Sequence, residues 1–220
     1  MKYRPLQPGL LVEGNSDEPY LRHLVKRHLD EVILNRSTRP VQVLGCQLSE
    51  VRTTAEPAEV LRAAAELGRD CDLLFVHGDA DALDKTLKLV AALAEQRSRA
   101  DRSGLPIPLV PVSMTESWML ADRTALASVL GAKTLAGYPY TKVSDVENRV
   151  RCHGSKKPVT PKQVWKTLLG DDAHDVLTDS AELLVRRTDL AVLKQLPSYR
   201  AWCDLTEDAL GELGYLLHRR

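Results

Sequence analysis

The sequence predicts an α/β fold in which helices cover a mainly parallel sheet, followed by a helical C-terminal part. Over the first 112 residues, short apolar runs alternate with longer amphipathic stretches, which is the pattern of strands connected by helices. After Val112 the strand signals stop and apolar residues recur at helical spacing. We therefore expect an α/β domain over residues 1–114 and a helical extension with a basic loop over residues 115–220, packed on the same domain.

Each element is expected from its local pattern. The strands are expected at residues 9–13, 41–48, 73–76 and 107–112. The helices between them are expected from about residue 15, over 57–67 and over 83–96, the first favoured by acidic residues in its opening turn. The later helices are expected over 115–130, with Gly131 as the C-terminal cap, and over 161–169, 179–196 and 198–217, with a long loop at 131–160.

Composition excludes several classes of protein. The 30 basic and 30 acidic side chains of the 220 residues cancel, so no overall charge attracts the chain to nucleic acid or membranes. No apolar run approaches the roughly 18 residues of a membrane-spanning helix, and the start of the chain lacks the apolar core of a signal peptide. Four widely spaced cysteines form no metal-binding pairs. We expect a cytoplasmic protein without a membrane partner.

Acidic side chains follow three of the predicted strands. Glu13 and Asp17 come after the first, Asp79 and Asp81 after the third, and Glu116 after the fourth. The carboxyl ends of parallel strands share one edge of a sheet, where ligands bind in open α/β folds, so these carboxylates are expected to converge. Such a cluster repels itself unless cations occupy it, and hard oxygen ligands suit Mg²⁺ or Mn²⁺. A structural role stays open, because acids are also common in first helical turns and as caps.

The segment from Lys142 to Lys166 is the one basic concentration in the chain, with seven basic against two acidic residues. Phosphodiester hydrolysis needs cations to stabilise the charge that grows on the phosphate. Lys142, Lys156 or Lys157 are candidates for this role, and the segment also fits contact with a phosphate backbone. The alternative is that these side chains form a solvated face.

Two stretches resemble a known family. Leu-Leu-Val-Glu-Gly at residues 10–14 with Asp17 beyond it, and an apolar strand ending in Asp79-Ala80-Asp81, look like the two signatures of the Toprim domain. The ExxxD spacing is closer to the OLD-type nucleases than to the topoisomerases. Residues 114–122 are similar to a segment of domain-of-unknown-function family 4276, whose members are also Toprim-like.

The resemblance implies a Toprim-like four-stranded sheet and metal chemistry. Asp79 and Asp81 would hold a divalent cation, Glu13 would be the acid, base or second metal ligand, and Asp17 and Glu116 would complete a second, OLD-like site. A lysine takes part in OLD-type nucleases, and Lys157 is the candidate here. Residues 115–118 replace the Lys-Asp pair of primases and topoisomerases, so hydrolysis is expected rather than nicking through a tyrosine.

The resulting hypothesis is a metal-dependent nuclease acting on DNA or RNA in bacterial defence against phage or plasmids. The chain lacks a phosphate-binding P-loop motif, so an ATPase would be a separately encoded partner. One alternative is a glycosyltransferase that binds a sugar nucleotide through Asp79 and Asp81 with Mn²⁺. Another is a non-catalytic Toprim-fold sensor or adaptor. The sequence leaves the oligomeric state open.

Overall fold

The computed structural model describes residues 3–98, 103–112, 114–148 and 159–217. The chain divides into two units, one formed by Met1–Val110 with Trp202–Arg220 and the other by Pro111–Ala201. The expected α/β class is confirmed, with an all-parallel four-stranded sheet, flanking helices and a helical C-terminal part. Each unit is described below by itself.

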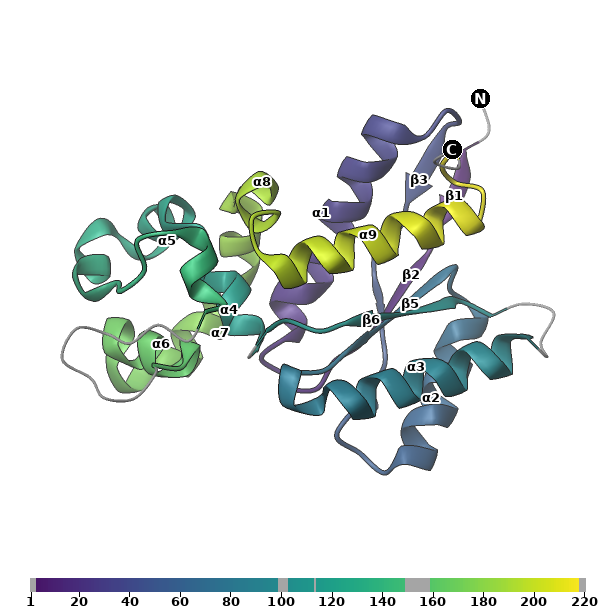
Figure 1. The fold of residues 1–220 in the computed structure, drawn as a ribbon, viewed down its shortest axis with the longest axis horizontal. Coiled ribbons are helices and arrows are strands. Elements are labelled where there is room, and N and C mark those ends of the chain that lie inside the picture. The colour runs from purple at the N-terminus through teal and green to yellow at the C-terminus, as the bar shows by residue number, and fades with distance from the viewer. Residues whose placement is uncertain (1–2, 99–102, 113, 149–158, 218–220) are drawn as a thin grey trace. The chain divides into compact units, whose positions relative to one another are not determined.

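The sheet of the first unit has the strand order β4-β2-β5-β6, and all neighbouring strands are parallel. Figure 1 labels three of these strands, β2, β5 and β6. Its strands are β4 (Gln47–Leu48), β2 (Pro8–Leu11), β5 (Leu73–His77) and β6 (Leu105–Leu109). A separate parallel pair joins β1 (Arg4–Leu6) to β3 (Val41–Val43). The single strand expected over 41–48 is therefore two strands, because β3 pairs with β1 whereas β4 pairs with β2.

Four α-helices accompany this sheet in the described part of the first unit. They are α1 (Glu18–Arg36), α2 (Pro57–Arg69), α3 (Leu83–Ser98) and α9 (Pro197–Glu212), the last belonging to this unit from Trp202 onward. A short 3-10 helix, η1 (Ala80–Ala82), leads from β5 into α3. α1 begins about three residues after its expected start, and α2 and α3 each extend two residues beyond their expected ends.

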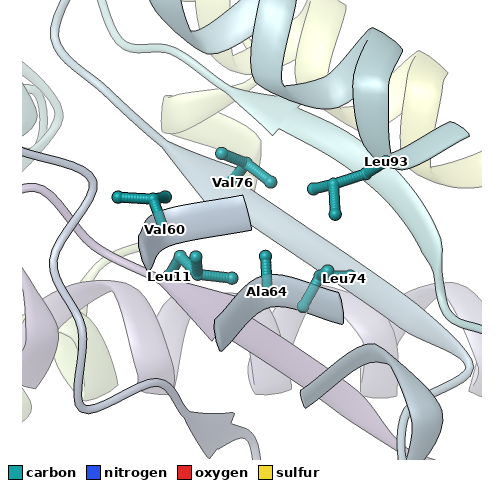
Figure 2. Close-up of a cluster of buried hydrophobic side chains, with 6 residues drawn as sticks. All are labelled: Leu11, Val60, Ala64, Leu74, Val76 and Leu93. Carbon is teal, nitrogen blue, oxygen red and sulfur yellow. The ribbon is translucent and has the colours of Figure 1, made fainter. Parts of the chain in front are cut away.

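Both faces of the sheet are buried. Towards α2 and α3, the sheet and helices share one apolar cluster, shown in Figure 2: Leu11, Val60, Ala64, Leu74, Val76 and Leu93. Side chains alternate along a strand, so Phe75 points the other way, and its ring lies 5.8 Å from that of Trp202 in α9. Burial on both faces explains why β5 is apolar from Leu73 to Val76. Each such buried side chain contributes about 1.5–3 kcal/mol to the free energy of unfolding.

The second unit is helical in its described part. Its elements are α4 (Thr115–Leu120), α5 (Arg123–Leu130), η2 (Ala132–Gly137), η3 (Val143–Val146), α6 (Pro161–Leu169), η4 (Gly170–Asp172), α7 (Ala173–Arg187) and α8 (Leu190–Leu193), followed by the start of α9. The expected helix over 115–130 is broken because Asp122 caps α5, accepting from the backbone N–H groups of Thr124 (2.9 Å) and Ala125 (3.0 Å). Gly131 ends α5 with a positive φ of 87°, as expected. In neither unit is any described helix both long and apolar enough to cross a membrane.

Candidate functional site

The candidate site lies at the carboxyl edge of the sheet, where β2 and β5 end side by side. Leu11 pairs with Val76 in the parallel register, so the residues that follow each strand meet at the same edge. Glu13 follows β2, and Asp79 follows His77, the last residue of β5. The structure brings Glu13, Asp17 and Asp79 to this edge.

A buried histidine lies at the centre of these acids. The side chain of His77 has no exposed surface, and its Nδ1 accepts the backbone N–H of Glu13 at 3.3 Å. Nδ1 also lies 3.9 Å from Asp17 Oδ2, and Nε2 lies 3.9 Å from Asp79 Oδ1. A neutral imidazole that accepts at Nδ1 carries its proton on Nε2, the nitrogen that faces Asp79.

Burial keeps this histidine neutral. Desolvation lowers the pKa of His77 below its ordinary value, and this effect outweighs the carboxylates of Asp17 and Glu13, which act in the opposite direction. The neutral ring therefore lies between the carboxylates of this edge and adds no positive charge to balance them. The negative charge of this edge is left for an external cation or a neighbouring basic side chain to balance.

Backbone hydrogen bonds orient two of the carboxylates. Glu13 Oε2 accepts the backbone N–H of Asp79 at 2.9 Å, which ties the end of β2 to the end of β5. Asp17 stands immediately before α1, and its Oδ2 accepts the N–H of Gly14 at 3.0 Å. The loop between β2 and α1 is thereby closed on itself, and each of these acids has one oxygen committed to the backbone.

The loop after β4 supports the same edge and was not expected from the sequence to take part. Thr53 donates its hydroxyl to the carbonyl of His77 (3.1 Å), and its N–H donates to the carbonyl of Val12 (3.0 Å). Arg52 holds the start of α1 through Glu18 Oε2 (3.0 Å) and Asn15 Oδ1 (2.8 Å). The signal that identifies this loop is its position after a third strand of the same sheet, since it contributes no acidic side chain to these contacts.

Within the described part of the chain, Asp81 takes no part in the contacts that bring Glu13, Asp17 and Asp79 together. It belongs to η1, is exposed, and lines a groove between α2 and α3. A small cavity of about 40 Å³ lies between Glu13 and the first turns of α3, and Lys85 lines both this cavity and the groove. Lys85 is thus a basic side chain next to Glu13 that the sequence analysis did not single out.

Glu116 belongs to the second unit, not to the unit that contains the sheet. It stands in the first turn of α4 and lines a pocket of about 230 Å³ together with Lys162, Trp165, Lys166 and His174. Lys142 is exposed and precedes η3. Lys156 and Lys157 lie outside the described residues.

The carboxylate oxygens of Glu13, Asp17 and Asp79 are the type of ligand that a hard divalent ion prefers, but they do not form a complete coordination site. Among the described residues, no group of three or more histidine, cysteine, aspartate or glutamate side chains is arranged to hold a metal ion. Mg²⁺ is usually held by one or two carboxylates together with its own waters and substrate phosphates. Glu13 and Asp79, which are joined by a hydrogen bond, are the pair best placed for this mode of binding.

No family model matches the sequence, and no curated protein or solved structure matches it. The resemblance to the Toprim domain and to family 4276 therefore stays a prediction.

Proposed function

We propose that the protein is a divalent-metal-dependent phosphodiester hydrolase, a nuclease acting on DNA or RNA. The observation that carries this proposal is the hydrogen bond from the Asp79 backbone to the Glu13 carboxylate, beside a buried histidine that Asp17 also approaches. A neutral histidine and three acids leave this edge negatively charged. Divalent cations are the usual partners of such an edge in phosphoryl transfer.

In this proposal, Glu13 and His77 have different roles in the hydrolysis. A bound Mg²⁺ or Mn²⁺ supplies polarisation of the phosphate and a more acidic water. Glu13, fixed by the Asp79 backbone, takes the proton of the attacking water as its oxygen bonds to phosphorus and the bond to the leaving oxygen breaks. His77 is a positioning residue, because its Nδ1 holds the backbone N–H of Glu13.

The charge on the phosphate also needs a cation from the chain. Lys85 lines the cavity next to Glu13 and is the described residue that we assign to this role. Lys157, the candidate from the sequence, lies outside the described residues. The OLD-like resemblance adds a partner to the proposal, an ATPase encoded as a separate chain, and a setting in defence against phage or plasmids.

The test is cleavage of supercoiled plasmid and of structured RNA with Mg²⁺, Mn²⁺ or EDTA. The intact chain is compared with Glu13→Gln and Asp79→Asn, and with Glu66→Gln as the matched control because Glu66 is an exposed acid of α2 in the same unit. We expect cutting that requires a divalent ion, is lost in the first two variants and is unchanged in the control. Equal cutting by all four proteins would overturn the proposal.

A further inference from the structure

A groove between α2 and α3 has the size and lining of a small-molecule site. Its volume is about 530 Å³, within the range of roughly 300–1,000 Å³ that is typical of ligand pockets. The walls carry aliphatic side chains that include Val60, Leu61 and Leu89. The charged side chains that line the same groove come from η1 and α3 and are two acids and two lysines, Asp81, Asp84, Lys85 and Lys88.

Two of these charged side chains are available to an anion. Lys85 and Lys88 are exposed and three residues apart, so they lie on one face of α3. Within the described part of the chain, neither makes a hydrogen bond or an ion pair. Lys85 also lines the cavity next to Glu13, which makes the groove a neighbour of the carboxylate edge.

We propose that the groove binds one nucleotide of the substrate, with the base against the aliphatic wall and the phosphate on Lys85 and Lys88. The ribose hydroxyls would donate to Asp81. A ligand with both a phosphate and hydroxyl groups fits a groove with acids beside two lysines better than an anion without donors does. The inference rests on the proposed function in one respect, because it takes this phosphate to be the one next to Glu13. A base held in the groove is not stacked in a duplex, so the nucleotide at this position is unpaired.

The probes are adenosine 5′-monophosphate and ribose 5-phosphate, each titrated by calorimetry into the full chain in EDTA. We expect the nucleotide to bind at least about tenfold more tightly, a difference of about 1.4 kcal/mol that reports the base in the groove. Equal affinities for the two ligands, or no binding of the nucleotide, would overturn the inference.

Variants separate the two parts of the ligand. Ala92→Leu fills the groove and should remove the preference for the nucleotide, and Leu61→Gln is a second variant with the same expectation should the first fold poorly. Lys85→Ala with Lys88→Ala should weaken both ligands about tenfold, whereas Lys133→Ala, an exposed lysine of the second unit, should change neither. Unchanged nucleotide binding by the folded groove variants would contradict the inference, as would a dimer of the intact chain that Ala92→Leu converts to a monomer.

The experiment distinguishes this inference from the proposed function. Nucleotide preference is read in EDTA, where no metal-dependent cutting occurs, and we expect Asp79→Asn to keep that preference. Cutting without any preference for the nucleotide would support the nuclease and contradict nucleotide binding in the groove. Preference for the nucleotide without cutting would support binding in the groove and contradict the nuclease.

Discussion

The carboxylate of Glu13 accepts the backbone N–H of Asp79 at 2.9 Å, and this bond joins the ends of two neighbouring parallel strands. Because the bond uses only one oxygen of Glu13, the side chain is oriented while its other oxygen stays available for chemistry. The backbone N–H of the same residue donates to His77, so both ends of Glu13 are held from β5 and the loop behind it.

This arrangement predicts different effects for two substitutions of Glu13. Glu13→Gln keeps a side-chain carbonyl for the Asp79 N–H but cannot take a proton, so cleavage should fall about 10²–10⁴-fold with little change in stability. Glu13→Ala should lose the same activity and about 1 kcal/mol of unfolding free energy as well. Cleavage rates and urea unfolding check both expectations, and full cleavage by Glu13→Gln would exclude Glu13 as the base.

The buried histidine predicts a pH dependence of stability. The pKa of His77 is lowered in the folded protein, so the unfolded chain takes up the proton first, at its ordinary pKa of about 6.5. Stability from the neutral ring is full above that pH and falls below it, by at most about 1.4 kcal/mol per pH unit. The charged groups that face the ring are the acids Glu13, Asp17 and Asp79, and His77→Gln substitutes none of them.

Urea unfolding between pH 7.5 and 5.5 in EDTA measures this effect. We expect the fall in stability to be shallower in His77→Gln than in the intact chain, and unchanged in His174→Gln, because His174 is exposed. Identical slopes for the intact chain and His77→Gln would show that the ring takes up its proton as easily when folded as when unfolded.

A close approach between β5 and α3 predicts a steric effect at Gly78. A Cβ at this position would overlap the hydroxyl of Thr86, which is only 4% exposed, so this side chain or the backbone would have to shift. Gly78→Ala should therefore lose about 1–3 kcal/mol of unfolding free energy. Thr86→Ala removes the obstructing hydroxyl, so the double variant should recover much of that loss.

The double-mutant cycle is the readout for Gly78 and Thr86. A favourable coupling of more than about 0.5 kcal/mol would confirm that the two side chains compete for one space. Simple addition of the two single effects would show that the loop after β5 moves to accommodate a methyl group.

Much of the fold follows from local sequence patterns. The parts that could not be expected from these patterns are set by long-range pairing between strands. The expected end of β5 differs from the observed end by one residue. This strand is predictable because so apolar a run can only be buried in the middle of a sheet. The split of the segment 41–48 could not be expected, since it arises from pairing with two different strands, one of which, β1, carries no apolar pattern of its own. The break before α5 did leave a signal, the capping residue Asp122.

The candidate site was predicted in part for a similar reason. Strand-end acids are visible in the sequence, so Glu13, Asp17 and Asp79 were found. The central position of His77 depends on hydrogen-bond geometry that a sequence does not show. Thr53 and Lys85 reach this edge from a neighbouring loop and a helix, and no motif marks either of them.

Binding of Mn²⁺, followed by electron paramagnetic resonance, tests the central claim most directly, because it requires neither substrate nor partner. The intact chain is compared with Glu13→Gln, Asp79→Asn and the control Glu66→Gln, all at the same ionic strength. The account predicts that the first two variants weaken Mn²⁺ binding at least about tenfold while the control leaves it unchanged. Equal Mn²⁺ binding by all four proteins, or none by the intact chain, would contradict the assignment of a metal to this edge of the sheet.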